Sequence, residues 1–251
     1  MRDITEFLRD WEFDPENQVR IIEADDGRSV LQIRQPLGVE QYELDGRPDG
    51  QRPQGRDCLL DVYKDMLREY ESEHGSDAGF VLDRDDCAYL QNEGIIYYYR
   101  YLVLFQIGDF DRTAADTAHN LQLCDLVGRY AENDEDRTEI LQYRPYILRI
   151  NAVARAMVNM NNEMITAAKD LLESAIQDIR SMPEVDSPTF EVERTKSISV
   201  LQSTLKQVLE AKASPTAGLE KELQQAVAEE NYELAAELRD KIRSLSRAER
   251  A

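Results

Sequence analysis

The spacing of apolar residues changes near residue 56, so no single kind of secondary structure can account for the whole chain. Before the change, two apolar runs, Val19 to Ile22 and Ser29 to Ile33, flank the turn signal Asp25-Asp26-Gly27. A third run, Val39 to Leu44, alternates between two faces and stops at Asp45-Gly46. Alternating runs separated by turn residues predict a three-stranded antiparallel β-meander. Such a small meander is marginal in water, so we expect it to lie against the helices that follow.

Beyond residue 56 the apolar residues recur every three or four positions, which predicts helices. The first helix is expected to end near His74-Gly75. A second, apolar or aromatic on nearly all sides, covers Tyr89 to Ile107, and is therefore expected to be buried on most sides. A late helix is expected over about Phe190 to Ala213, after a break between two prolines.

Two of the expected turns between helices show the same spacing of residues. Gly108 suits the left-handed position that ends a helix, and Asp109 or Asp111 can cap the next one. The spacing from Gly108 to Ala115 recurs from Asn161 to Ala168. The run Gly108 to Ala114 resembles the turn between the helices of tetratricopeptide repeats (TPR). This resemblance implies a TPR-like body of helical hairpins.

The composition limits the functions that the chain can have. Its 251 residues include 30 Lys and Arg against 50 Asp and Glu, which gives a net charge of −20. Binding through phosphate contacts needs a basic face, so this balance argues against a general nucleic-acid binder. Cys58, Cys87 and Cys124 have no Cys or His at ligand spacing, and we expect neither disulfides nor a zinc site. A charged N-terminus without a long apolar run predicts a soluble, cytoplasmic protein.

Some residues allow both a functional and a plainer interpretation. The aromatic run from Tyr97 to Phe105 suits a core or a groove wall better than a base-stacking platform, because its neighbours are not basic. In a TPR-like body, Tyr98, Arg100 and Tyr101 would line a peptide groove. His119 is interpreted as a surface or hydrogen-bonded residue, and Cys124 as a small buried one.

The sequence has no residue pattern that is typical of a catalytic site. The acidic stretches 83–86 and 132–136 lack the order of a calcium loop and are interpreted as solvated loops. The chain has neither a glycine-rich phosphate loop nor the GxSxG turn of hydrolases. We therefore expect no catalytic residues, no metal and no cofactor, and keep an unrecognised enzyme only as an alternative.

The last part of the chain predicts two short amphipathic helices. Ser214-Pro215 suits a helix start, and Glu230-Asn231 suits a turn. Two apolar stripes flank this turn: Leu219, Leu223, Ala226 and Val227 precede it, and Ala235, Leu238, Ile242 and Leu245 follow it. A hairpin of this length is too small to be stable alone, so we expect it to pack against a partner, a second copy or the body.

The order of residues in this hairpin resembles the UVR motif, which occurs in the excision-repair proteins UvrB and UvrC, in the unfoldase ClpC and in the kinase activator McsA. The resemblance covers Leu219 to Leu245 and rests on Leu223, Ala226, Asn231-Tyr232-Glu233, Ala235-Ala236, Leu238-Arg239-Asp240 and Ile242. The rest of the chain shows no helicase motif, nuclease cluster or CxxC pair, so the catalytic functions of those proteins are not implied. What the resemblance implies is a protein-binding element.

The resemblance also implies roles for single residues. The expected partner-binding residues are Leu223, Tyr232, Glu233, Leu238, Arg239 and Ile242. The expected hairpin-packing residues are Leu219, Ala226, Ala235, Ala236 and Leu245. Beyond Leu238 five basic residues stand against two acidic ones, a balance of 5 − 2 = +3, which keeps nucleic-acid binding by this end as an alternative.

Together these observations predict a mostly α (α+β) protein in three parts. Residues 1–55 form the meander and a Pro/Gly-rich connection, residues 56–213 the TPR-like body, and residues 214–251 the UVR hairpin. The expected function is that of a non-enzymatic adaptor in excision repair, with UvrB or UvrC, or in regulated proteolysis, with a ClpC- or McsB-like partner. No membrane association is expected, and a homodimer is left open.

Overall fold

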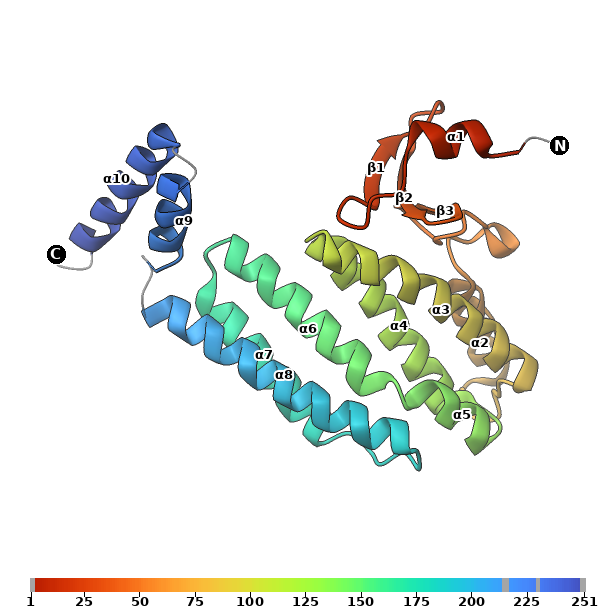
Figure 1. The fold of residues 1–251 in the computed structure, drawn as a ribbon. Coiled ribbons are helices and arrows are strands. Elements are labelled where there is room, and N and C mark those ends of the chain that lie inside the picture. The colour runs from red at the N-terminus through yellow and green to blue at the C-terminus, as the bar shows by residue number, and fades with distance from the viewer. Residues whose placement is uncertain (1–2, 214–216, 229–230, 249–251) are drawn as a thin grey trace.

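The computed structural model describes residues 3–213, 217–228 and 231–248 (Figure 1). A small sheet near the N-terminus is followed by a layer of long antiparallel helices and by a separate C-terminal hairpin. The predicted mostly α (α+β) fold is confirmed. Among the described helices, none is long and apolar enough to cross a membrane.

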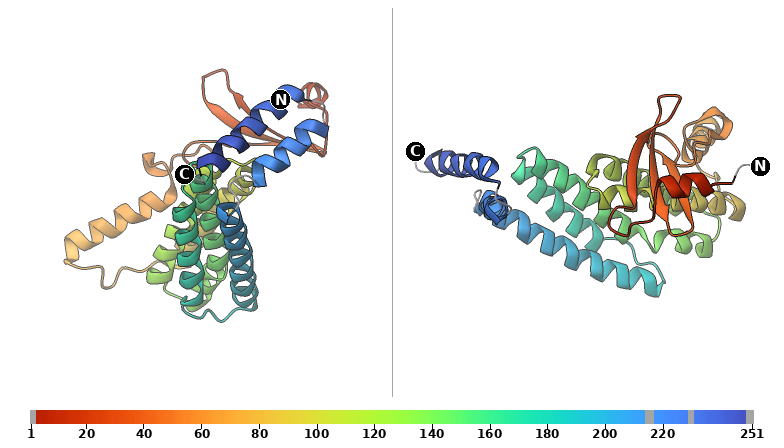
Figure 2. Two further views of the ribbon diagram at one scale, coloured as in Figure 1. Left: turned by 90° about the vertical axis from the view of Figure 1, so that its left-hand side faces the viewer. Right: turned by 45° about the horizontal axis from the view of Figure 1, so that its top comes forward.

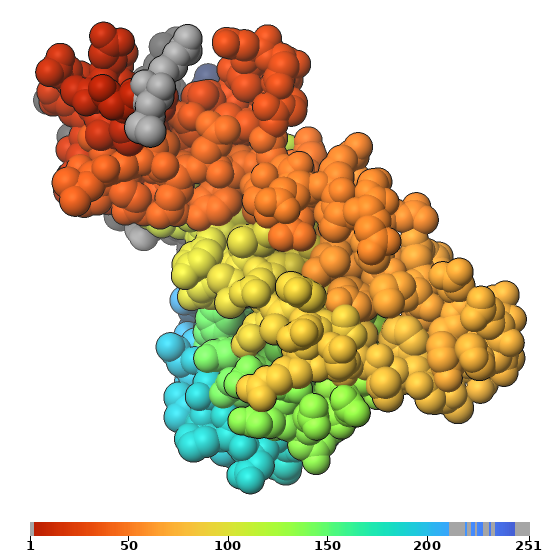
Figure 3. All heavy atoms as spheres, turned by 90° about the vertical axis from the view of Figure 1, so that its right-hand side faces the viewer, coloured from red at the N-terminus to blue at the C-terminus, as the bar shows by residue number. Residues whose placement is uncertain are grey.

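The three strands form the predicted meander. They are β1 (Val19–Glu23), β2 (Ser29–Gln35) and β3 (Gly38–Glu43), paired antiparallel in the order β1-β2-β3. A short helix that the sequence pattern did not predict, α1 (Thr5–Asp10), precedes them. Leu31 of the central strand and Leu44 pack with Leu104 of the body, so the meander covers one end of the helices (Figure 3).

Seven helices make up the described body (Figure 2). They are α2 (Leu59–His74), α3 (Arg84–Gln106), α4 (Phe110–Tyr130), α5 (Asp134–Leu141), α6 (Arg144–Asn161), α7 (Ile165–Arg180) and α8 (Pro188–Ala213). From α3 onward, neighbouring long helices pack in chain order, α3 on α4, α4 on α6, α6 on α7 and α7 on α8. Most of the body therefore consists of pairs of helices that are close together in the sequence.

Three of the turns between the helices of the body contain left-handed residues. Gly75 ends α2 with φ 75°, and Gly108 has φ 80° between α3 and α4. The side chain of Asp109 then accepts a hydrogen bond from the backbone N–H of Arg112, as expected for a cap. At the second turn the left-handed residue is Glu163, with φ 61°, although glycine is the residue that usually occupies this conformation.

The interpretation of both acidic stretches as solvated loops is wrong. Asp83 caps α3, because its carboxylate accepts the N–H of Asp86 while the Asp86 carboxylate accepts the N–H of Asp83. The second stretch leads into α5, whose first turn carries Asp134, Glu135 and Asp136. Carboxylates near helix N-termini are favourable because they meet free N–H groups and the positive end of the helix dipole.

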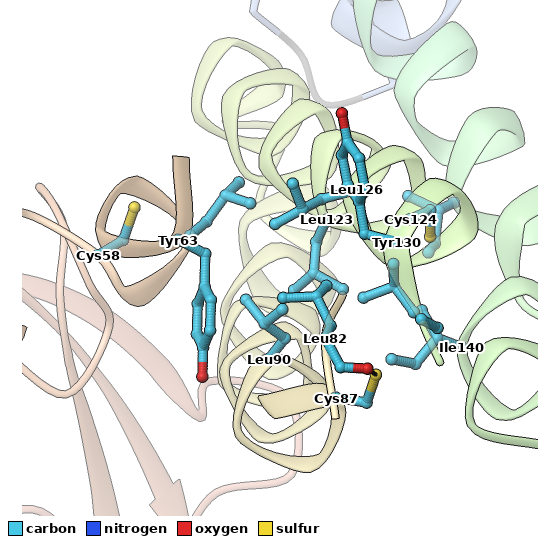
Figure 4. Packing of buried hydrophobic residues seen from close by; sticks show 14 residues of the cluster. Cys58, Tyr63, Leu82, Cys87, Leu90, Leu123, Cys124, Leu126, Tyr130 and Ile140 are labelled. Atoms are coloured by element: carbon cyan, nitrogen blue, oxygen red, sulfur yellow. Dashed lines mark hydrogen bonds between the residues drawn. The ribbon is translucent and has the colours of Figure 1, made fainter. Parts of the chain in front are cut away.

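The body contains two apolar cores that meet along α6. The first lies among α2, α3, α4 and α5 and includes Tyr63, Leu90 and Cys124 (Figure 4). The second lies among α6, α7 and α8. Helix α6 contributes Ile147 to the first core and Ala152 to the second, so it connects them.

The C-terminal hairpin follows directly on α8. Helix α8 ends at Ala213, α9 (Ala217–Ala228) begins at Ala217, and α10 (Tyr232–Ala248) runs back along α9. In Figures 1 and 2 the hairpin stands beyond the end of α8, on the opposite side of the molecule from the meander.

Candidate functional site

The two hairpin helices are held together by a narrow apolar seam. Ala226, Ala235 and Leu238 are buried there, and Leu219 and Leu223 pack against them. The small alanine side chains permit the two helix backbones to approach closely. The seam therefore explains how a pair of such short helices keeps its shape.

The turn of the hairpin is built on Asn231. Its backbone N–H donates to the carbonyl of Ala226, and its side-chain oxygen accepts the N–H of Leu234 at 3.3 Å. Asparagine is among the preferred helix N-caps because its short side chain can satisfy a free N–H of the first turn. Asn231 thus ends the turn and starts α10.

Apolar and charged side chains remain on the outer surface of the hairpin. Val227 is 52% exposed and Leu234 is 42% exposed. On α10 the exposed Arg239 lies 3.4 Å from the carboxylate of the exposed Asp240. These four residues are therefore among the described residues of the hairpin that another chain can reach.

Some of the residues that were expected to bind a partner lie in the seam, and others lie on the outer surface. Leu223 and Leu238 lie in the seam with the residues expected to pack the hairpin, whereas Arg239 points outward and Ile242 is half-buried. The side chains of Tyr232, Glu233 and Leu245 lie outside the described residues, as do Ser214 and Pro215. Of the remaining packing residues, Ala236 is half-buried.

Sequence reasoning did not predict that Leu234 and Val227 face outward. Val227 belonged to the expected apolar stripe, and Leu234 was not singled out. Leu234 follows Asn231 by three positions and precedes Leu238 by four. Because residues four positions apart lie only about 40° apart around a helix, Leu234 lies beside Leu238, at the edge of the apolar stripe. Val227 lies beside Ala226 on the other helix, so the way the two helices pack decides that both side chains stay exposed.

A model of the UvrB/uvrC motif matches residues 216–248. The hairpin is a UVR motif. Neither a curated protein nor a solved structure matches the chain. The UVR resemblance is thus confirmed for the C-terminal hairpin, whereas the TPR-like character of the body is not confirmed.

The aromatic run on α3 contributes buried side chains to the interior of the body. Tyr97 and Tyr101 are buried, which excludes them from a base-stacking platform. Tyr98, Tyr101, Tyr143 and Tyr146 line a cavity of about 440 Å³ among α3, α4, α5 and α6. Burial raises the pKa of Tyr146 to about 12, so the Tyr146 hydroxyl stays protonated at ordinary pH.

Arg100 does not line a groove. Its guanidinium makes two hydrogen bonds to Asp116, at 2.8 and 2.6 Å, and a third, at 2.6 Å, to the carbonyl of Glu43. The expectation that Arg100 would contact a bound peptide is wrong, because the whole side chain is used to join α3, α4 and the end of β3.

Cys124 is the small buried residue that was expected. It is 1% exposed within the first core, and burial raises the pKa of its thiol to about 12. His119 is mostly buried, and its ring stacks on Tyr97. The thiol of Cys124 therefore stays protonated and unreactive at ordinary pH.

Proposed function

We propose that the chain is a non-enzymatic adaptor whose UVR hairpin binds a protein partner. The observation that supports the proposal best is the arrangement of the hairpin, whose seam is filled by its own side chains while Val227, Leu234 and Arg239 stay exposed. Because the hairpin closes its own seam, it does not need the body to complete it. Its outer surface is available to another chain.

The family match suggests two partner systems. One is excision repair, where UvrB or UvrC would be bound. The other is regulated proteolysis, where a ClpC-like unfoldase or a McsB-like kinase would be bound. We do not propose direct nucleic-acid binding, since the net charge of −20 opposes it and the +3 balance beyond Leu238 supplies few phosphate contacts.

Exposed residues of the hairpin should control partner capture. We expect Leu234→Asp and Arg239→Glu to weaken binding at least about 10-fold, because exposed apolar and arginine side chains carry much of the energy in protein interfaces. Neither side chain lies in the seam, so the hairpin itself should persist. The measurement is capture of UvrB-, UvrC-, ClpC- or McsB-like proteins from the host lysate, followed by titration with the purified partner.

Two further variants make this measurement decisive. A chain ending at Ala213 should capture none of these partners. Val192→Asp, which changes an exposed apolar residue of α8 instead, should bind like the unaltered chain. Equal capture by the full and the shortened chains would contradict the proposal. Deletion in the host then distinguishes the systems: loss of ultraviolet survival indicates repair, and heat sensitivity with altered protein turnover indicates proteolysis.

A further inference from the structure

Three chemically reactive side chains from separate segments meet at the start of α2. Cys58 immediately precedes α2, Glu93 lies on α3 and His119 lies on α4. The Cys58 sulfur, one Glu93 carboxylate oxygen and one His119 ring nitrogen all lie within 4.8 Å of one another. Cys58 and Glu93 are buried, and the His119 side chain is 11% exposed. Cys58 also belongs to the first apolar core, but neither Glu93 nor His119 does, and none of the three lies in the UVR motif.

Glu93 is held as an ionised carboxylate with room for another partner. Its Oε2 accepts the N–H of Leu59 at 2.6 Å and lies 3.2 Å from Arg47. Its Oε1 accepts the N–H of Leu60 at 2.9 Å and faces His119. Burial alone would raise the pKa of Glu93, but the neighbouring His119 ring and the two N–H groups outweigh burial and lower it. Since a carboxylate offers about four lone-pair sites, Oε1 retains one on the His119 side.

The ring of His119 is held in place by stacking, but its Nε2 atom has no hydrogen-bond partner among the described residues. Its ring stacks on Tyr97 with the ring centres 3.8 Å apart and the planes inclined by 12°. Its Nε2 lies 3.3 Å from Glu93 Oε1 without hydrogen-bond geometry, and it makes no hydrogen bond within the described residues. A buried polar atom without a hydrogen-bond partner costs free energy, and a ligand bound at Nε2 would remove that cost.

We propose that Cys58, Glu93 and His119 bind a divalent transition-metal ion with the preferences of Zn²⁺. Zinc binds sulfur, nitrogen and oxygen at about 2.0–2.3 Å, so two tetrahedral ligands lie about 3.3–3.8 Å apart. The 3.3 Å between His119 Nε2 and Glu93 Oε1 fits this geometry. A sulfur ligand disfavours magnesium and calcium, which prefer oxygen.

The charges also suit such an ion. In the protein as described, burial raises the pKa of the Cys58 thiol to about 12, so the thiol is protonated. Metal binding would release this proton to solvent and leave a thiolate. One thiolate and one carboxylate balance a charge of +2, while Arg47 remains on the other carboxylate oxygen and is paired with Asp49. A water molecule would complete four-coordination.

The bound ion would join the start of α2 to α3 and α4. The sequence analysis expected no metal, because positions 58, 93 and 119 are far apart and show none of the short ligand spacings of zinc motifs. Only the packing of three helices brings the ligands together. The proposal does not depend on the proposed adaptor function.

The test is metal titration of the full chain, purified without a histidine tag and treated with a chelator. We expect one Co²⁺ per chain, an absorption band from thiolate-to-cobalt charge transfer, and displacement of Co²⁺ by Zn²⁺. Cys58→Ala should remove the charge-transfer band, and Cys58→Ala and His119→Gln should each weaken binding at least about 100-fold, which exceeds the 10–100-fold effect of changing an outer partner of a ligand.

Matched controls come from the other cysteines and the other histidine. Cys87→Ala, Cys124→Ala and His74→Gln should keep both the band and the affinity. If the Cys58 or His119 variants fail to fold, X-ray absorption on the Zn²⁺-loaded unaltered chain still decides the matter, with one sulfur ligand expected. Absence of stoichiometric binding, zero sulfur ligands, or a band that survives in Cys58→Ala would overturn the proposal.

Discussion

Replacing Arg100 with alanine should lower the free energy of unfolding by about 3–5 kcal/mol, the range measured when one partner of a buried ion pair is removed. The side chains of Arg100 and Asp116 are 4% and 5% exposed. Without the guanidinium, the Asp116 carboxylate would stay buried without its counter-charge, and the carbonyl of Glu43 would lose its donor. Urea unfolding followed by circular dichroism measures the loss.

The control for this prediction is an exposed ion pair. Arg28→Ala removes contacts with Asp26 and Glu43 at a residue that is more than half exposed, and should cost less than about 1 kcal/mol. The double variant Arg100→Met with Asp116→Leu should recover much of the loss, because no charge then remains buried. A loss below 1 kcal/mol in Arg100→Ala would contradict the description of this pair as buried.

Leu201→Ala should be similarly damaging, at about 2–5 kcal/mol, because it opens a cavity in the second core. Leu201 is 0% exposed and packs with residues of α6 and α7. Leu209 lies on the same helix but is 40% exposed, so Leu209→Ala should change stability by only about 0.5 kcal/mol. Thermal and urea unfolding of the two variants give the comparison, and equal losses would show that α8 is not packed as described.

The sequence predicted those features that are determined locally. The strands followed from alternation around Asp25-Asp26-Gly27, and the ends of α2 and α3 followed from Gly75 and Gly108. The UVR hairpin was predicted from the order of its residues alone. Each of these signals lies within a few positions of the structure that it determines.

Features that depend on distant residues were not predictable in this way. The true start of α3 at Arg84 and the helix α5 were not predicted, because acidic residues are common in both loops and helix starts. The pairing of Arg100 with Asp116, and the meeting of Cys58 with His119, arise only when α2, α3 and α4 pack. The exposure of Leu234 depends on how α9 and α10 pack against each other.

The short connection between α8 and the hairpin restricts where a captured partner can be. Ala213 ends α8 and Ala217 begins α9, so the start of the hairpin lies within about 15 Å of the end of α8 whatever path the chain takes between them. A partner held by α9 and α10 would therefore meet the acidic body at an effective concentration in the millimolar range. A weak second contact with that body, negligible between free molecules, would then lengthen the lifetime of the complex.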